Sequence, residues 1–173
     1  MDLIAQYEIP FLHPLAVHFP LVTLLLGAAA AVFYAVLGRA VWRKAGLILF
    51  VLGALSAWAS NETGHDLYQA VEGDPIVEEV VQAHQNGAKW TLIVSTVASG
   101  VFALVSLARL RRRRPPPDEV AAEDAPAGDK APRGSKREPL WGRLVALVPA
   151  TLAAALVAWT AHLGGIMVWG VPR

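Results

Sequence analysis

The stretch LAVHFPLVTLLLGAAAAVFYAVL, residues 15–37, contains no Asp, Glu, Lys or Arg. A helix needs about 20 predominantly apolar residues to cross a hydrocarbon core about 30 Å thick. The residues before this stretch include Asp2 and Glu8 but no Lys or Arg, so the basic flank of a cleavable signal peptide is missing. We therefore expect a membrane-spanning helix that is retained in the mature protein.

Three further apolar blocks follow, at residues 45–60, 90–107 and 144–168, and only His162 interrupts the last one. Hydrophobic residues make up 55% of the chain and the mean hydropathy is +0.44, whereas soluble domains have about 45–50% apolar residues. The blocks do not alternate between apolar and polar residues as strands of a membrane barrel do. The sequence predicts one all-α membrane domain over residues 1–173, an integral four-helix bundle. Its helices are expected at about 13–38, 41–66, 76–108 and 140–166.

Basic residues are concentrated in two of the three connections between the blocks. Residues 38–44 and 108–143 hold thirteen of the 15 Lys and Arg residues, whereas residues 61–89 hold Lys89 and six acidic residues. The positive-inside rule therefore places the two basic connections in the cytoplasm. Both termini and residues 61–89 are then expected on the periplasmic side of a bacterial inner (cytoplasmic) membrane that the chain crosses several times.

The long basic connection is expected to contain a disordered cytoplasmic loop over about residues 115–139. It opens with three prolines and continues as a mixture of Ala, Asp, Glu, Gly and Lys with no apolar periodicity. In the acidic connection, by contrast, Asp74-Pro75 is a typical helix start, so the third helix is expected to begin outside the membrane. The net charge of +1 argues against a nucleic-acid partner.

All five histidines, His13, His18, His65, His84 and His162, fall at the predicted outer side, and every predicted helix contributes at least one. Polar groups in membrane spans are costly, usually face the bundle interior and mark functional sites by default. Spacing from flanking aromatic residues predicts a deep pair, His18 and His162, and a shallow pair, His65 and His84. His13 is the weakest candidate because it lies at a helix start, close to water.

Small residues surround His162: alanines at 150, 154, 155, 158 and 161 lie before it, and Gly164 and Gly165 follow it. Such residues let helices approach closely, and they also leave room for a flat macrocycle beside its ligand. The pattern alone favours neither explanation. The chain has no cysteine, which excludes disulfides, thiolate metal sites and covalently attached haem.

Four segments carry a family resemblance, and they cover nearly the whole chain outside the predicted loop. They are HPLAVHFP at 13–20, TGH at 63–65, AH at 83–84 and HLGGIMVWG at 162–170. In this order they resemble the bacterial membrane-protein family catalogued as domain of unknown function 2231. The resemblance implies four helices with histidines in these places. Some relatives are joined to cytochrome c or rubredoxin-like domains, which implies electron transfer, although this chain has no such fused domain.

Three functions are compatible with the histidines. The first is binding of b-type haem through inward-facing imidazoles of His18 and His162, or of His65 and His84, for electron transfer with a periplasmic carrier. The second is a zinc or copper site for binding or transport, made by the same four residues with His13 as a weaker ligand. The third is a structural subunit of a larger membrane complex that has no cofactor.

An enzyme is less expected than an electron-transfer or binding protein. The sequence contains no nucleotide-binding glycine loop, nucleophile elbow or metalloprotease helix. A copper(I) pathway usually uses Met or Cys, and the chain has only Met1 and Met167. For zinc, Glu62 and Asp66 flank His65 and can supply a carboxylate.

Overall fold

The computed structural model describes residues 13–71, 78–112 and 138–169. These residues form only helices, and the predicted all-helical class and four-helix membrane architecture are confirmed. Four helical stretches are long and apolar enough to cross a membrane: His13–Leu37, Ala40–His65, Glu78–Arg111 and Leu140–Met167. The predicted disordered loop at 115–139 lies outside the described residues, except for its last two positions.

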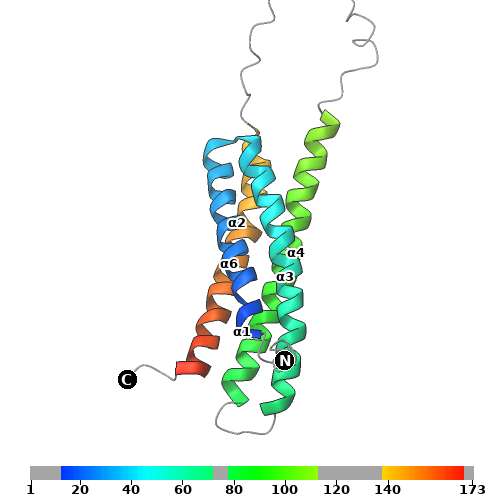
Figure 1. The fold of residues 1–173 in the computed structure, drawn as a ribbon. Coiled ribbons are helices and arrows are strands. Elements are labelled where there is room, and N and C mark those ends of the chain that lie inside the picture. The colour runs from blue at the N-terminus through cyan, green and yellow to red at the C-terminus, as the bar shows by residue number, and fades with distance from the viewer. Residues whose placement is uncertain (1–12, 72–77, 113–137, 170–173) are drawn as a thin grey trace, which may run out of the picture.

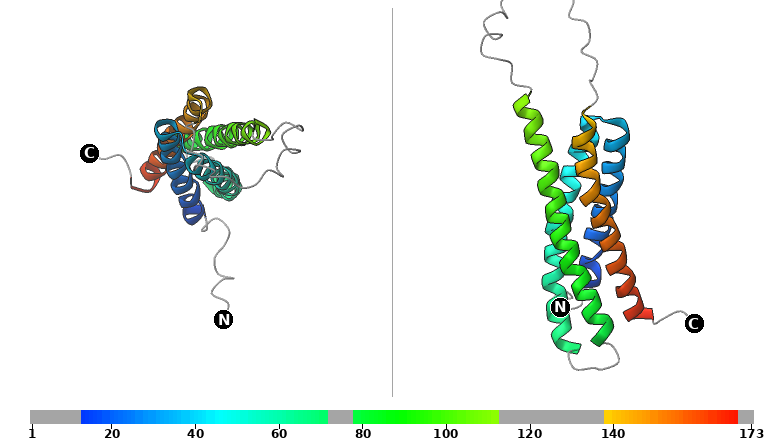
Figure 2. Two further views of the ribbon diagram at one scale, coloured as in Figure 1. Left: turned by 90° about the horizontal axis from the view of Figure 1, so that it is seen from above. Right: turned by 180° about the vertical axis from the view of Figure 1, so that it is seen from behind.

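The helices are α1 (His13–Ala16), α2 (His18–Leu37), α3 (Ala40–Val71), α4 (Glu78–Arg112) and α6 (Leu140–Trp169). The four long helices run alternately up and down, and consecutive ones lie side by side around a common axis (Figures 1 and 2). Helix α6 also packs against α2 and closes the ring, while the short α1 packs against α3. This is the antiparallel, up-and-down arrangement of a four-helix bundle.

Local sequence explains the two breaks near the start of the chain. The sequence predicted one helix over 13–38, but the structure has α1 and α2 with a turn at Val17 between them. Pro20 has no N–H to donate to the carbonyl of Ala16, which weakens a continuous helix at this point. Helix α2 ends at Gly38, whose left-handed φ of 62° suits a glycine and whose N–H donates to the carbonyl of Tyr34 over 2.9 Å.

Small residues bring the helices together around a few buried aromatic rings. Phe50 and Phe102 are fully buried and stacked, with ring centroids 5.5 Å apart. A Cβ added to Gly46 would lie 2.6 Å from Cε1 of Phe102, so α3 and α4 can pack this closely only with glycine there. The outer surface carries exposed Leu, Val, Ile and Trp side chains, as lipid contact requires.

One end of the bundle, here called the arginine end, is closed by a buried ion cluster. Glu138, 8% exposed, accepts hydrogen bonds from Tyr34 Oη over 2.5 Å and from Arg43 Nε over 3.2 Å. Arg109 lies 3.7 Å from the same carboxylate, and Arg43 also donates to Ser106. The cluster therefore joins α2, α3 and α4 to the residues just before α6.

Candidate functional site: the histidine end

The opposite end of the bundle, here called the histidine end, holds the starts of α1, α2 and α4 and carries all five histidines. His84, near the start of α4, is half-buried against α6, and its Nδ1–H donates to the carbonyl of Thr160 over 2.9 Å. A carbonyl oxygen can only accept, so this bond assigns the proton to Nδ1. In the neutral ring, Nε2 therefore keeps its lone pair.

His13 is held in the same way by α3. Its Nδ1 lies 3.0 Å from Oγ1 of Thr63, which itself lies 3.1 Å from the carbonyl of Ser60. When the threonine hydroxyl donates to that carbonyl, its oxygen accepts from the Nδ1–H of His13. The rings of His13 and His84 are nearly perpendicular, at 84°, with centroids 6.4 Å apart. The two imidazoles therefore lie next to each other, and in their neutral forms each has Nε2 unprotonated.

Glycines allow both rings to lie against helix backbones. A Cβ added to Gly64 of α3 would lie 2.8 Å from Cε1 of His13, and one added to Gly164 of α6 would lie 3.3 Å from Cε1 of His84. At Gly165, by contrast, an added Cβ would meet nothing within 4 Å. Gly64 and Gly164 are therefore part of the site, because larger residues there would push against the rings.

Hydroxyl groups from three helices are buried one to two turns deeper in the bundle. Thr91 of α4 and Thr160 of α6 are 4% and 9% exposed, and their Oγ1 atoms lie 3.4 Å apart. Ser60 of α3 is also buried, and its Oγ has no hydrogen-bond partner among the described residues. The histidine pair therefore lies above a polar layer rather than directly on the apolar core.

The remaining histidines have exposed side chains. His18 donates from Nδ1 to the carbonyl of Pro14 over 2.5 Å, and the ring of His162 lies beside Trp159 with centroids 5.9 Å apart. His65 is exposed near the end of the apolar part of α3. The structure thus brings His84 together with His13, the histidine that the sequence ranked lowest. Ligation by His18, His65, His84 and His162 stays a prediction.

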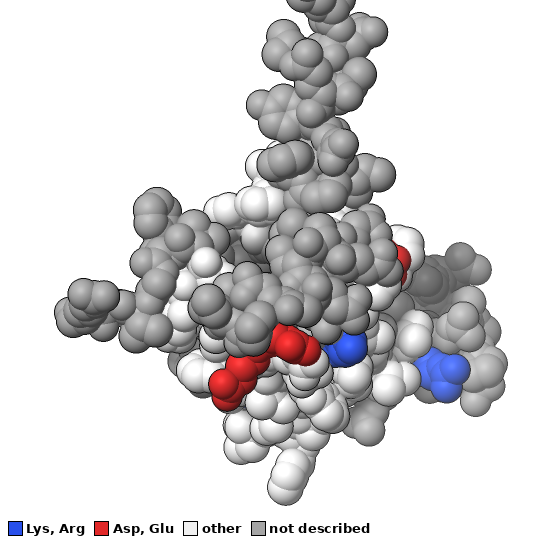
Figure 3. Space-filling view, turned by 90° about the horizontal axis from the view of Figure 1, so that it is seen from below, with Lys and Arg blue, Asp and Glu red and all other residues white. Residues whose placement is uncertain are grey.

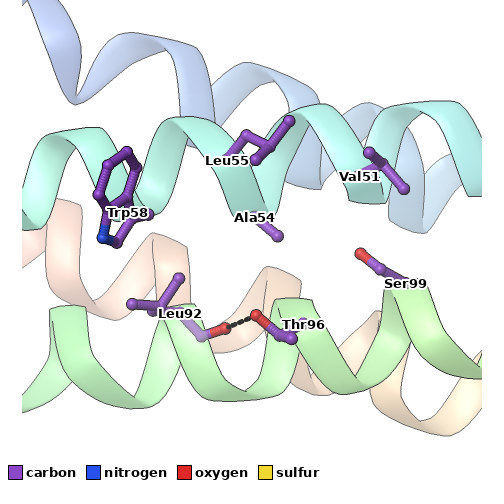
Figure 4. A pocket seen from close by; sticks show the side chains of 7 residues that line it. All are labelled: Val51, Ala54, Leu55, Trp58, Leu92, Thr96 and Ser99. Atoms are coloured by element: carbon purple, nitrogen blue, oxygen red, sulfur yellow. Dashed lines mark hydrogen bonds between the residues drawn. The ribbon is translucent and has the colours of Figure 1, made fainter.

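The surroundings of the pair hold no larger ligand cluster among the described residues. Within residues 13–71, 78–112 and 138–169, no three His, Cys, Asp or Glu side chains gather closely enough to hold a metal ion. An open groove of about 380 Å³ lies between α3 and α4, but its lining contains no histidine (Figure 4). Its residues are Val51, Ala54, Leu55, Trp58, Leu92, Thr96 and Ser99.

Sequence reasoning missed two kinds of residue. It assigned Glu138 to a loop with nothing to bury, but the carboxylate is the centre of the ion cluster at the arginine end. A signal was present, because Arg43 follows an otherwise apolar segment and needs a counter-ion if buried. The partners of the two rings were also missed. Thr63 resembles the other hydroxyl residues of the spans, and Thr160 accepts through its backbone carbonyl, which no sequence pattern marks.

Comparison with known proteins gives a family but no function. The family model described as "Predicted membrane protein (DUF2231)" matches residues 9–171. No curated protein and no solved structure matches the chain. Because the match covers almost the whole sequence, the chain belongs to this family of predicted membrane proteins.

Proposed function

We propose that the protein binds a transition-metal ion at the histidine end, through Nε2 of His13 and Nε2 of His84. One observation carries the proposal: both Nδ1 atoms are engaged by acceptors on other helices, while the two rings stand 6.4 Å apart. Metal-binding imidazoles usually donate their second N–H to a protein acceptor, which fixes the tautomer. Two imidazoles on opposite sides of one ion, at about 2.0 Å each, place their centroids about 6 Å apart.

Neutral imidazole suits several transition metals, and zinc and copper are the two candidates for this site. The chain offers no thiolate because it has no cysteine. The role would be metal binding or transport in a bacterial inner membrane, with the histidine end on the outer side. The basic connections at the arginine end support that orientation.

A second candidate is a b-type haem for electron transfer, and a different pair of histidines favours it. Helices α2 and α6 are neighbours, and His18 at the start of α2 and His162 near the end of α6 are both exposed at the same end. A haem iron takes two imidazoles from different helices. The rings of His13 and His84 pack against Gly64 and Gly164, which leaves no slot for a macrocycle there. A haem would therefore lie on the bundle surface and exchange electrons with a periplasmic carrier.

Four single variants separate the two candidates. His13→Asn and His84→Asn keep an amide N–H close to the position of Nδ1, so the bonds to Thr63 and Thr160 survive while the Nε2 ligand is lost. His18→Asn and His162→Asn are the matched changes at exposed rings. Each protein is purified in lipid nanodiscs, and its bound copper, zinc and iron are measured together with its absorption spectrum.

We expect the His13 and His84 variants to lose copper or zinc and the His18 and His162 variants to retain it. If wild-type protein from haem-sufficient cells shows a Soret band that only the His18 and His162 variants lose, the haem candidate replaces the metal site. Wild-type protein that binds neither added metal nor haem contradicts both candidates and leaves the histidines a structural role.

A further inference from the structure

Exposed tryptophans form a ring around the bundle near the histidine end. Trp58 of α3, Trp90 of α4 and Trp159 of α6 are 57%, 58% and 57% exposed. Contacts between the helices show that they lie at similar heights. Gly87 faces Thr160 across α4 and α6, and Trp58 lines the same groove as Leu92. Tryptophan is enriched where a membrane meets water, because its ring is apolar and its N–H is polar.

Two further tryptophans mark the arginine end. On α3, Trp42 lies sixteen residues before Trp58, about 24 Å along the helix, and on α6 Trp141 lies eighteen residues before Trp159, about 27 Å. The stretches between these levels, residues 45–57, 91–108 and 144–158, contain no charged residue. A band of this height approaches the hydrocarbon thickness of about 30 Å.

Charged side chains begin again at both edges of the band. Lys89 is exposed directly outside Trp90, and Lys44 is exposed at the opposite edge. Beyond the outer edge, Glu62, Glu78 and Glu79 are exposed, and Figure 3 shows acidic side chains gathered on this end of the molecule. Such charges are costly in hydrocarbon. The aromatic rings and the charges therefore mark the same two edges.

The histidine pair lies outside this band. His13 contacts Gly64, six residues or about 9 Å beyond Trp58 along α3. The ring of His84 donates to the carbonyl of Thr160 and lies against Gly164, one and five residues beyond Trp159 along α6, so it lies outside the tryptophan ring by less than about 8 Å. We infer that the outer membrane boundary lies at Trp58, Trp90 and Trp159, and that the His13–His84 site lies in the aqueous headgroup layer. Its ligand is then a hydrated metal ion that arrives from water; this last step rests on the proposed function.

Spin labels on cysteines test the boundary directly, because the wild-type chain has no cysteine. Gln82, Asn86, Ile93 and Val97 are all exposed on α4, two on each side of the inferred boundary. Each is replaced by cysteine, labelled with a nitroxide and placed in nanodiscs. Collision with a water-soluble nickel complex is then compared with collision with oxygen, which concentrates in hydrocarbon.

Labels at 82 and 86 should collide mainly with the nickel complex and those at 93 and 97 mainly with oxygen. The logarithm of the ratio of oxygen collisions to nickel collisions should therefore change sign between 86 and 93. Oxygen-dominated collision at 82 and 86 overturns the inference, because His84 would then lie within the hydrocarbon. The result does not depend on metal binding. A wild-type protein without metal contradicts the proposed function alone, and a misplaced sign change contradicts the boundary alone.

Discussion

His13 and His84 differ from the exposed histidines in what orients them. Each directs Nδ1 to a group on another helix, so the ring position depends on how the bundle is packed. His18 bonds to its own segment at Pro14. The sequence identified all five histidines, and spacing from aromatic residues ranked them by depth. Neither could show which imidazole rings lie next to each other in the bundle. That depends on helix rotation and on the glycines at 64 and 164.

The partner of His13 provides a test at single-residue scale. Thr63→Val keeps the shape of the side chain but removes the acceptor for Nδ1–H, so the ring loses its fixed tautomer and orientation. Loss of such outer partners costs roughly ten- to hundredfold in metal affinity. Thr151→Val is the control, because that exposed hydroxyl bonds only to carbonyls of its own helix. Titration of copper or zinc into both variants checks the expectation, and equal affinities would contradict the role of Thr63.

Glu138 carries the second single-residue test. Glu138→Gln leaves the buried Arg43 guanidinium without its carboxylate, and breaking such a pair by removing one partner costs about 3–5 kcal/mol. The thermal unfolding midpoint in detergent should fall clearly. Glu79→Gln, an exposed change at the other end, should stay within about 0.5 kcal/mol of wild type. An unchanged midpoint for Glu138→Gln would show that the ion cluster does not hold the arginine end together.

Helices were predictable as elements because hydropathy reports which segments lie in lipid. The outer end of α3 was not, since this helix continues to Val71 through polar residues that carry no hydropathy signal. The break at Val17 follows from Pro20, but its position depends on how α1 packs against α3. Short connections place α2, α3 and α4 side by side in chain order, whereas the contacts of α6 with α4 and α2 needed the structure.

Close packing of α3 and α4 can be tested with one methyl group. Gly46→Ala places a Cβ against the ring of Phe102, which is buried and stacked on Phe50 and cannot move aside. Overpacking of this kind costs about 1–3 kcal/mol. Gly100→Ala on α4 is the control, since an added Cβ there meets nothing within 4 Å. Thermal midpoints should fall for Gly46→Ala and stay level or rise for Gly100→Ala; a fall in both would point to a general glycine requirement.

At the scale of the whole molecule, the two ends have opposite chemistry. The arginine end carries Arg43 of α3 and Arg109 of α4 around one buried carboxylate, and the histidine end carries exposed acids and imidazoles. Charge asymmetry of this kind sets orientation during membrane insertion. The sequence therefore predicts which end faces the cytoplasm, and this prediction decides which pool of metal ions would reach the proposed site at His13 and His84.

Cysteine labelling in intact cells tests that orientation. Glu79 is exposed at the histidine end and Lys44 at the arginine end, so Glu79→Cys and Lys44→Cys each add one accessible thiol to a cysteine-free chain. A maleimide that cannot cross the inner membrane should label Glu79→Cys in intact cells and Lys44→Cys only after the membrane is opened. The reverse pattern would place the histidine end in the cytoplasm. The site would then draw on intracellular metal, and a periplasmic electron carrier would be excluded as its partner.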